Sequence, residues 1–149
     1  MSEVLLAAQN LSISFGGLHA VSNVNFEVQM GQIHAIIGPN GAGKTTFVNC
    51  VSGVLPPSDG HVYLDGIDIT RWPRHRRARA GLSRTYQNLR LFAELTVAEN
   101  VEVGLVADGR ASLRGRSACV RQALEKQGLE HLQRETVSSL SYGLQRRVE

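Results

Sequence analysis

The sequence predicts an α/β fold that opens with antiparallel strands, continues through a strand, a glycine-rich loop and a helix, and ends in further helices. Apolar and polar side chains alternate over residues 21–30, which is the period of a half-buried antiparallel strand. The apolar run 33–37 is typical of a short buried strand, and residues 44–51 after it are typical of a helix. Beyond residue 88 the signals are those of helix starts and stops, so we expect a helical part there.

The N-terminal strands are bounded by glycine. Two strand-like stretches, residues 4–8 and 11–15, are followed by a break at Gly16-Gly17. The alternating stretch 21–30 follows, and Gly31 ends it. We therefore expect a small antiparallel sheet before the glycine-rich loop.

Further local signals place the elements that follow the helix 44–51. Gly53 is a C-terminal stop, and residues 56–60 are a turn. Residues 61–66 return as a strand whose Asp65-Gly66 pair is a hairpin signal. Residues 81–87 run into another expected strand, which ends on Gln87.

The predicted helical part has two clear helices. Thr96 and Glu99 have the spacing of a capping box, which starts a helix that runs to about residue 106. A short basic region that we expect to be exposed leads to a second helix, residues 117–127, which Gly128 stops.

Composition agrees with one globular domain of 149 residues, 42% of them hydrophobic. The net charge of +3 permits an acidic partner without requiring one. No stretch approaches the ~20 apolar residues of a membrane span, and no secretory signal is present, so we expect the chain to stay in the cytosol. Cys50 and Cys119 lack metal-ligand spacing, and we expect both to be small buried thiols in helices.

The glycine-rich stretch fits the phosphate-loop pattern G-x-x-x-x-G-K-[ST] without a gap. Its residues are Gly38, Pro39, Asn40, Gly41, Ala42, Gly43, Lys44 and Thr45. The glycines permit backbone angles that turn consecutive N–H groups toward a phosphate, and the helix N-terminus adds its positive end. The expected strand before the loop and helix after it supply the context that the motif requires, so we predict nucleotide binding.

Three side chains of this segment have expected roles. Lys44 is a point charge for the β- and γ-phosphates, and the Thr45 hydroxyl is the expected ligand of a Mg²⁺ ion that keeps most of its waters. Thr46 caps or packs locally.

Other stretches complete a larger pattern. They are Phe15-Gly16 before the loop, residues 62–70, Arg84-Thr85-Tyr86-Gln87, residues 89–101, and Leu140-Ser141-Tyr142-Gly143-Leu144-Gln145-Arg146-Arg147. From about residue 4 to the last residue, the sequence resembles the nucleotide-binding subunit of ATP-binding cassette (ABC) transporters. The resemblance implies a P-loop NTPase (RecA-like) core with an N-terminal antiparallel β subdomain and a helical subdomain, incomplete at the C-terminus. Residues 1–88 would hold the β subdomain and core, and residues 89–149 the helical subdomain with the signature.

The resemblance also implies residue roles. Phe15 would stack on adenine, although an aromatic at a strand end is also an ordinary core residue. Gln87 would reach the Mg²⁺ and attacking-water region. The apolar residues of 89–101 would lead into the subdomain that docks against a membrane partner, or would be core instead.

The signature stretch implies a dimer. Ser141 and the backbone at Gly143 would present donors to the γ-phosphate held by a second subunit. Tyr142 and the Gln-Arg-Arg continuation are most similar to subunits for branched-chain amino acid uptake. Leu144 departs from the family, where Gln is usual, and an apolar side chain makes no polar contact across that interface.

One expected feature of the family is absent from the sequence. No later apolar strand ends in Asp-Glu, so the Walker B pair and the switch His are missing. Asp65 ends a strand-like stretch but precedes a hairpin glycine, away from the Mg²⁺ position that the resemblance implies. The chain stops at Glu149 inside an expected helix, and we expect a truncated subunit that binds ATP but hydrolyses it poorly.

The function that these observations predict is an ATP-binding, energy-coupling subunit of an ABC importer. ATP and Mg²⁺ are the expected cofactors, and a second nucleotide-binding subunit and transmembrane permease subunits are the expected partners. The permease would hold the chain at the inner face of the cell membrane. The alternative is a non-transport P-loop ATPase that binds nucleic acid through the basic stretch 71–84, although we expect no nucleic acid partner.

Overall fold

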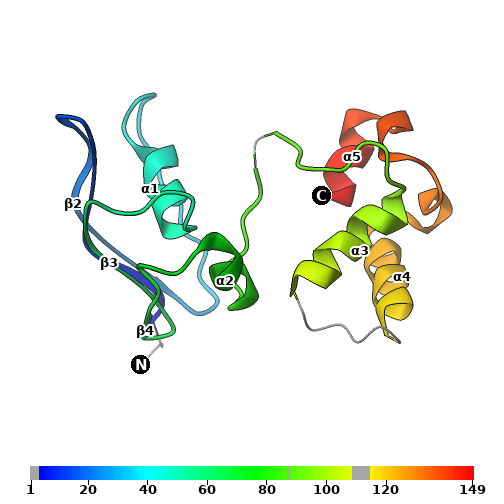
Figure 1. Ribbon diagram of the computed structural model, residues 1–149, viewed down its shortest axis with the longest axis horizontal. Coiled ribbons are helices and arrows are strands. Elements are labelled where there is room, and N and C mark those ends of the chain that lie inside the picture. Colours follow the sequence, from blue (N-terminus) through cyan, green and yellow to red (C-terminus); the bar gives the residue numbers. More distant parts are fainter. Residues whose placement is uncertain (1–3, 87, 109–114) are drawn as a thin grey trace. The chain divides into compact units, whose positions relative to one another are not determined.

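The computed structural model describes residues 4–86, 88–108 and 115–149 of the chain. They form two compact units, Met1–Ser83 and Arg84–Glu149, and Figure 1 labels the α-helices and most of the strands. The domain boundary near residue 88 remains a prediction.

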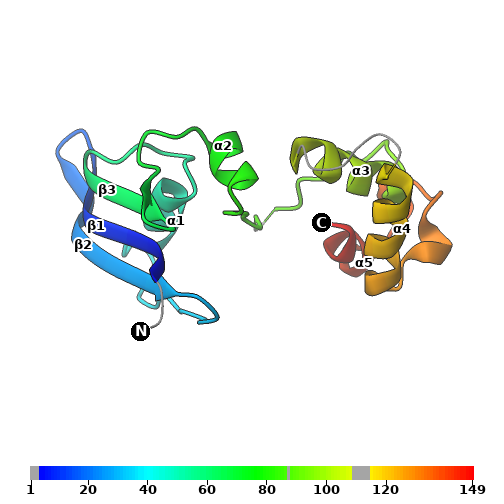
Figure 2. The same ribbon diagram turned by 90° about the horizontal axis from the view of Figure 1, so that it is seen from below.

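The first unit is built on a four-stranded antiparallel sheet with the strand order β2-β1-β3-β4. Its strands are β1 (Val4–Phe15), β2 (Leu18–Gln29), β3 (Asp59–Leu64) and β4 (Ile67–Asp68). Figure 2 shows β1 between β2 and β3. The predicted antiparallel sheet is confirmed, and the β1–β2 turn falls at Gly16-Gly17 as predicted.

The two expected strands 4–8 and 11–15 form one continuous strand with an irregularity at its centre. Asn10 has a φ of 51°, and the pairing register between β1 and β2 shifts between Ala8 and Leu11. The Asn10 N–H donates to Oδ1 of Asn25 at 2.9 Å, which replaces a regular ladder bond. The polar residues at this bulge explain why the apolar pattern is interrupted here.

The other predicted turn of the sheet is also confirmed. Asp65 and Gly66 have φ values of 50° and 71° and join β3 to β4. Two consecutive positive φ angles are what a two-residue hairpin turn of the common type requires.

Helix α1 (Lys44–Val51) has the predicted bounds, and Gly53 follows its end with a φ of 77°. The helix packs on the sheet through Phe47, whose ring meets that of Phe26 edge to face at 5.5 Å between centroids. The buried core of the unit consists of Ala8, Leu11, Ile13, Val21, Phe47, Cys50, Val51, Val62 and Ile69. Helix α2 (Arg74–Arg79) follows Pro73.

The two cysteines differ in their surroundings. Cys50 is buried as expected, and burial raises the pKa of its thiol. The expectation of burial was wrong for Cys119, which is exposed on its helix.

Two predicted strands do not form in the part of the chain that the structure describes. Residues 33–37 have no regular secondary structure, and Ile33 and Ile37 are 100% and 90% exposed. Residues 82–86 also form no strand, and Gln87 lies outside the described residues. A strand requires a partner for its N–H and C=O groups. In the described part of the chain, β1–β4 pair only with one another, so neither segment has such a partner.

The second unit is helical. It contains α3 (Val97–Asp108), α4 (Arg116–Gln127), α5 (Tyr142–Val148) and the 3-10 turns η1 (Glu130–Leu132) and η2 (Val137–Ser139). Gly128 ends α4 with a φ of 61°, as predicted. The core is formed by Val97, Val120, Leu124, Leu129, Val137 and Val148. The expected exposed region before α4 lies mostly outside the described residues.

The segment that leads into α3 is held by polar side chains. The Thr96 N–H donates to Oε2 of Glu99 at 2.7 Å, and the Glu99 N–H donates to Oγ1 of Thr96 at 3.3 Å, which confirms the capping box. The half-buried Leu91 packs on the core, whereas Phe92 is exposed. The side chain of the buried Asn100 accepts from the Phe92 N–H and donates to its carbonyl.

Candidate nucleotide site

The phosphate loop folds directly onto the first turn of α1. Gly38, Gly41 and Gly43 have φ values of 157°, 85° and 81°, so Gly41 and Gly43 occupy backbone conformations that favour glycine. Gly43 also lies against β2, since a β-carbon built on it would be 2.2 Å from the Ala20 carbonyl oxygen. The loop is therefore seated against the sheet at its last glycine, directly before Lys44.

Lys44 folds back over the loop that precedes it. Its Nζ donates to the carbonyl oxygens of Gly38 and Pro39, both at 2.7 Å. The first intrahelical bond runs from the Phe47 N–H to the Gly43 carbonyl at 2.8 Å. The N–H groups of the first turn, before Phe47, have no intrahelical acceptor, which is the general condition of a helix start. The ammonium group and these amides create a positive region for a phosphate group.

The residues after Lys44 differ in exposure. Thr45 is exposed, and Thr46 is half-buried. A hydroxyl next to the lysine, on the solvent side of the first helical turn, is a hard oxygen donor of the kind that Mg²⁺ binds. The chain thus offers a suitable ligand for a nucleotide-bound Mg²⁺. Among the described side chains there is no group of three or more His, Cys, Asp or Glu residues arranged to hold a metal ion without nucleotide.

An apolar cavity of about 280 Å³ opens between β2 and the loop. Val21 and Phe26 of β2 line it, together with Ile37, Gly43 and Lys44. The walls suit an uncharged flat or aliphatic group next to the charged loop.

Phe15, which we expect from the sequence to stack on adenine, lies beside the β1–β2 turn and is 50% exposed. Figure 1 shows this turn and the loop before α1 toward the same end of the unit.

Asp65 lies in the turn between β3 and β4, and its N–H donates to the Leu5 carbonyl at 2.8 Å. It therefore belongs to the antiparallel hairpin, as the sequence predicts.

The signature stretch lies in the second unit. Ser141 precedes α5 with an extended conformation, and Tyr142 is 60% exposed and stacks with Arg146. Leu144 is half-buried and packs against the helical core. Its apolar side chain thus has a packing role inside this unit, which explains why an apolar residue is tolerated here.

The sequence did not predict two groups that hold the candidate site segments in place. Nε2 of Gln145 donates to the carbonyls of Val137 and Leu140, at 3.1 and 3.0 Å, and so fixes the chain just before Ser141. The carbonyl of Ala20, on which Gly43 lies, is the second. A glutamine on a short helix and a backbone oxygen carry no sequence signal, so neither was predictable from pattern.

Comparison with solved structures defines the class of protein as an ATP-binding cassette. MJ1267, an ATP-binding cassette of an ABC transporter, superposes with a TM-score of 0.86 at 30% identity over 100% of this chain and 63% of that one. MJ0796, solved as a dimer in a post-hydrolysis state bound to ADP and phosphate, gives a TM-score of 0.80 at 27% identity over 97% of this chain and 66% of that one.

The sequence profile of the family described as ABC transporter matches residues 21–149, and the chain belongs to this family. It is 40% identical, over its whole length, to the high-affinity branched-chain amino acid transport ATP-binding protein BraF of Pseudomonas aeruginosa. It is 41% identical to the corresponding protein LivG of Escherichia coli K12. The chain spans 64% of the length of both relatives. The expected α/β P-loop cassette fold and the resemblance to the branched-chain amino acid type are thus confirmed.

The chain is also similar, at lower identity, to the ATP-binding protein of another transport system. The lipopolysaccharide export system ATP-binding protein LptB of Escherichia coli K12 is 36% identical over 97% of this chain and 60% of that protein. Within the described ranges, no helix has both the length and the apolar character needed to cross a membrane.

Proposed function

We propose that the chain is the ATP-binding, energy-coupling part of an ABC importer for branched-chain amino acids. The observation that carries this proposal is the complete phosphate loop, seated on β2 through Gly43 and followed by Lys44 at the start of α1. The similarity to BraF and LivG supports the substrate class.

The residues of the loop divide the work of binding. Lys44 exchanges its two carbonyl partners for the β- and γ-phosphates, and the glycine-rich backbone and first-turn amides donate to the remaining oxygens. The Thr45 hydroxyl and the Gln87 amide hold the Mg²⁺ that accompanies ATP and neutralises part of its charge. Phe15 stacks on the base.

A second subunit completes the site in this proposal. Ser141, Tyr142, Gly143 and Leu144 of one chain approach the ATP held by the loop of the other, so that ATP closes a dimer. Permease subunits in the membrane follow this closure and hold the chain at the inner face of the cell membrane. The solved dimer of MJ0796, 27% identical to this chain, supports the dimeric arrangement.

The alternative as a nucleic-acid-binding ATPase is not favoured. Of the arginines in the basic stretch, Arg77 is buried and Arg76 stacks on Trp72, with its guanidinium carbon 3.8 Å from the ring centroid. Both contacts are internal, which reduces the charge available to a phosphate backbone. BraF, LivG and LptB, to which the chain is similar, are by name transport or export proteins.

Substitution of Lys44 tests the proposal. We expect Lys44→Ala to abolish most of the affinity for Mg-ATP, because it removes the cation aimed at the phosphates and leaves neutral amides. Equilibrium binding to the purified 149-residue chain measures the effect, with Lys126→Ala, a change of the chain's only other lysine, as the control. Unchanged affinity in a folded Lys44→Ala protein would contradict the proposal.

A further inference from the structure

A buried arginine ties the far end of the phosphate-loop helix to the segment after β4. Arg77 of α2 is 1% exposed. Its Nη1 donates to the carbonyls of Cys50 and Val51, at 2.9 and 2.6 Å, which are the last residues of α1. Its Nη2 donates to the Thr70 carbonyl at 2.8 Å, and its Nε donates to the Trp72 carbonyl at 3.0 Å. One side chain therefore holds four backbone carbonyls from two segments.

The charge of Arg77 is offset by backbone oxygens, because its guanidinium donates to four carbonyl groups. Burial lowers the pKa of Arg77, while the negative charges of the ionised Cys50 side chain and of the Asp68 carboxylate favour its charged form. Two of its acceptors lie at the C-terminal end of α1, where the helix dipole is negative and favours a cation. The contact is therefore both a hydrogen-bonded clamp and an electrostatic cap.

The absence of a side chain at Gly53 leaves room for the Arg77 side chain. A β-carbon on Gly53 would lie 2.9 Å from Nε and 3.0 Å from Cδ of Arg77. The glycine has a φ of 77°, and its N–H donates to the Cys50 carbonyl at 3.0 Å. The chain just beyond α1 thus leaves room for the guanidinium at the point where the clamp closes.

We propose that Arg77 is a positioning residue for the nucleotide: it fixes the C-terminal end of α1 and so sets the direction in which the first turn presents Lys44 and Thr45. Helix α1 is only eight residues long, so a shift at Val51 is carried to its other end. Lys44 lies at that other end. The proposal rests on the proposed function, since it concerns the same phosphate site.

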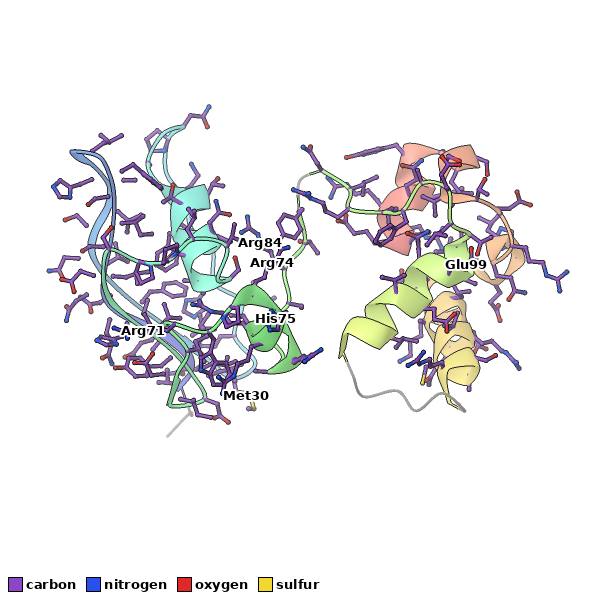
Figure 3. All side chains as sticks on the ribbon, in the orientation of Figure 1. Met30, Arg71, Arg74, His75, Arg84 and Glu99 are labelled. Atoms are coloured by element: carbon purple, nitrogen blue, oxygen red, sulfur yellow. The ribbon has the colours of Figure 1, made fainter. Side chains whose placement is uncertain are left out.

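The test distinguishes an effect on the position of Lys44 and Thr45 from an effect on the stability of the folded chain. Mg-ATP affinity is measured for Arg77→Lys and Arg77→Met at a temperature at which circular dichroism shows each variant to be folded. We expect affinity to fall about threefold to tenfold, since small misplacements of a binding group are costly, and the loss to be smaller for Lys, which keeps the charge. Arg74→Met is the control, because Arg74 is an exposed residue of the same helix (Figure 3).

A second pair of variants leaves Arg77 in place. Gly53→Ala and Gly31→Ala impose similar backbone strain, because the φ values are 77° and 78°, but only the first adds an atom against Arg77. We expect Gly53→Ala to weaken Mg-ATP binding and Gly31→Ala to leave it unchanged.

The outcomes are distinct. If the unsubstituted chain does not bind Mg-ATP, the proposed function fails. If it binds, and the folded Arg77 and Gly53 variants bind equally well with only a lower unfolding temperature, Arg77 is a structural clamp and the positioning role is wrong.

Discussion

Two features of the structure favour glycine at position 43. The backbone there has a positive φ of 81°, and the Ala20 carbonyl oxygen occupies the space where a β-carbon would lie. Only the first feature applies to Gly41, because its φ is 85° but no atom lies within 4 Å of the position that a β-carbon would take. Two glycines of one motif therefore have different physical reasons to be glycine, and the motif pattern alone does not separate them.

We expect Gly41→Ala to cost about 1 kcal/mol in the free energy of unfolding, from backbone strain alone. Gly43→Ala should cost clearly more, because the loop must also move off β2 or push it away. Denaturant unfolding of both variants measures the difference. Equal costs would show that the loop does not lie against Ala20 in solution.

Phe15 permits a test of base recognition. We expect Phe15→Ala to weaken ATP binding by about 1 kcal/mol while leaving inorganic triphosphate unaffected, since stacking acts only on the base. Competition binding with both ligands separates the two effects. Leu18→Ala is the control, because Leu18 pairs with Phe15 across the turn and is also exposed. Equal losses for ATP and triphosphate would remove Phe15 from the base site.

At the scale of elements, the start of α3 gives a prediction about pH. Hydrogen bonds from the Thr96 backbone and hydroxyl lower the pKa of Glu99 in the folded state. A lowered folded pKa stabilises the unit above the unfolded pKa, and this contribution is lost as pH falls through the folded value.

We therefore expect Glu99→Gln to be less stable than the unsubstituted chain at neutral pH, and the gap to close on acidification below the ordinary pKa of a glutamate. Unfolding curves across that acidic range measure the gap. Glu102→Gln, an exposed change on the same helix, should show no such closure. A gap that stays constant with pH would show that the capping box does not form.

Elements with local causes were predictable from the sequence. Helix α1 begins and ends where the loop and Gly53 indicate, and α4 ends at Gly128. The strand 33–37 was not correctly predicted, because an apolar run specifies burial but not the neighbour that must accept its hydrogen bonds. For the candidate site, the loop residues were predictable from spacing, whereas Arg77 was read only as part of a basic stretch, because burial of a cation has no pattern of its own.

At the scale of the whole molecule, the two units have separate cores. One is centred on the sheet and α1, and the other on α3, α4 and α5. The phosphate loop belongs to the first unit and the signature to the second. The two halves of the proposed composite site are thus built on different scaffolds, which suits a site that is completed between subunits.

We expect the 149-residue chain, tested on its own, to bind Mg-ATP and to release phosphate at no more than a trace rate. In the proposed function Lys44, Thr45 and Gln87 would supply phosphate and metal contacts, but no apolar stretch of the sequence ends in an Asp-Glu pair of the kind that would hold Mg²⁺ and polarise water. A positioned base alone contributes about 10²- to 10⁴-fold. Phosphate release is measured beside Lys44→Ala, and rapid turnover that vanishes in this control would contradict the expectation.

The pairing of β1 with both β2 and β3 has a consequence for biosynthesis. β1 and β2 are adjacent in the sequence, and a hairpin of this kind forms in about 1–10 μs. Its other partner, β3, is synthesised only seconds later, because translation adds about 5–20 residues per second. During that interval the nascent chain presents an open edge of β1, and a two-stranded ribbon is only marginally stable in water. Arrival of Asp59–Leu64 closes the edge. All four strands of the sheet that supports the phosphate loop are therefore translated before the signature residues.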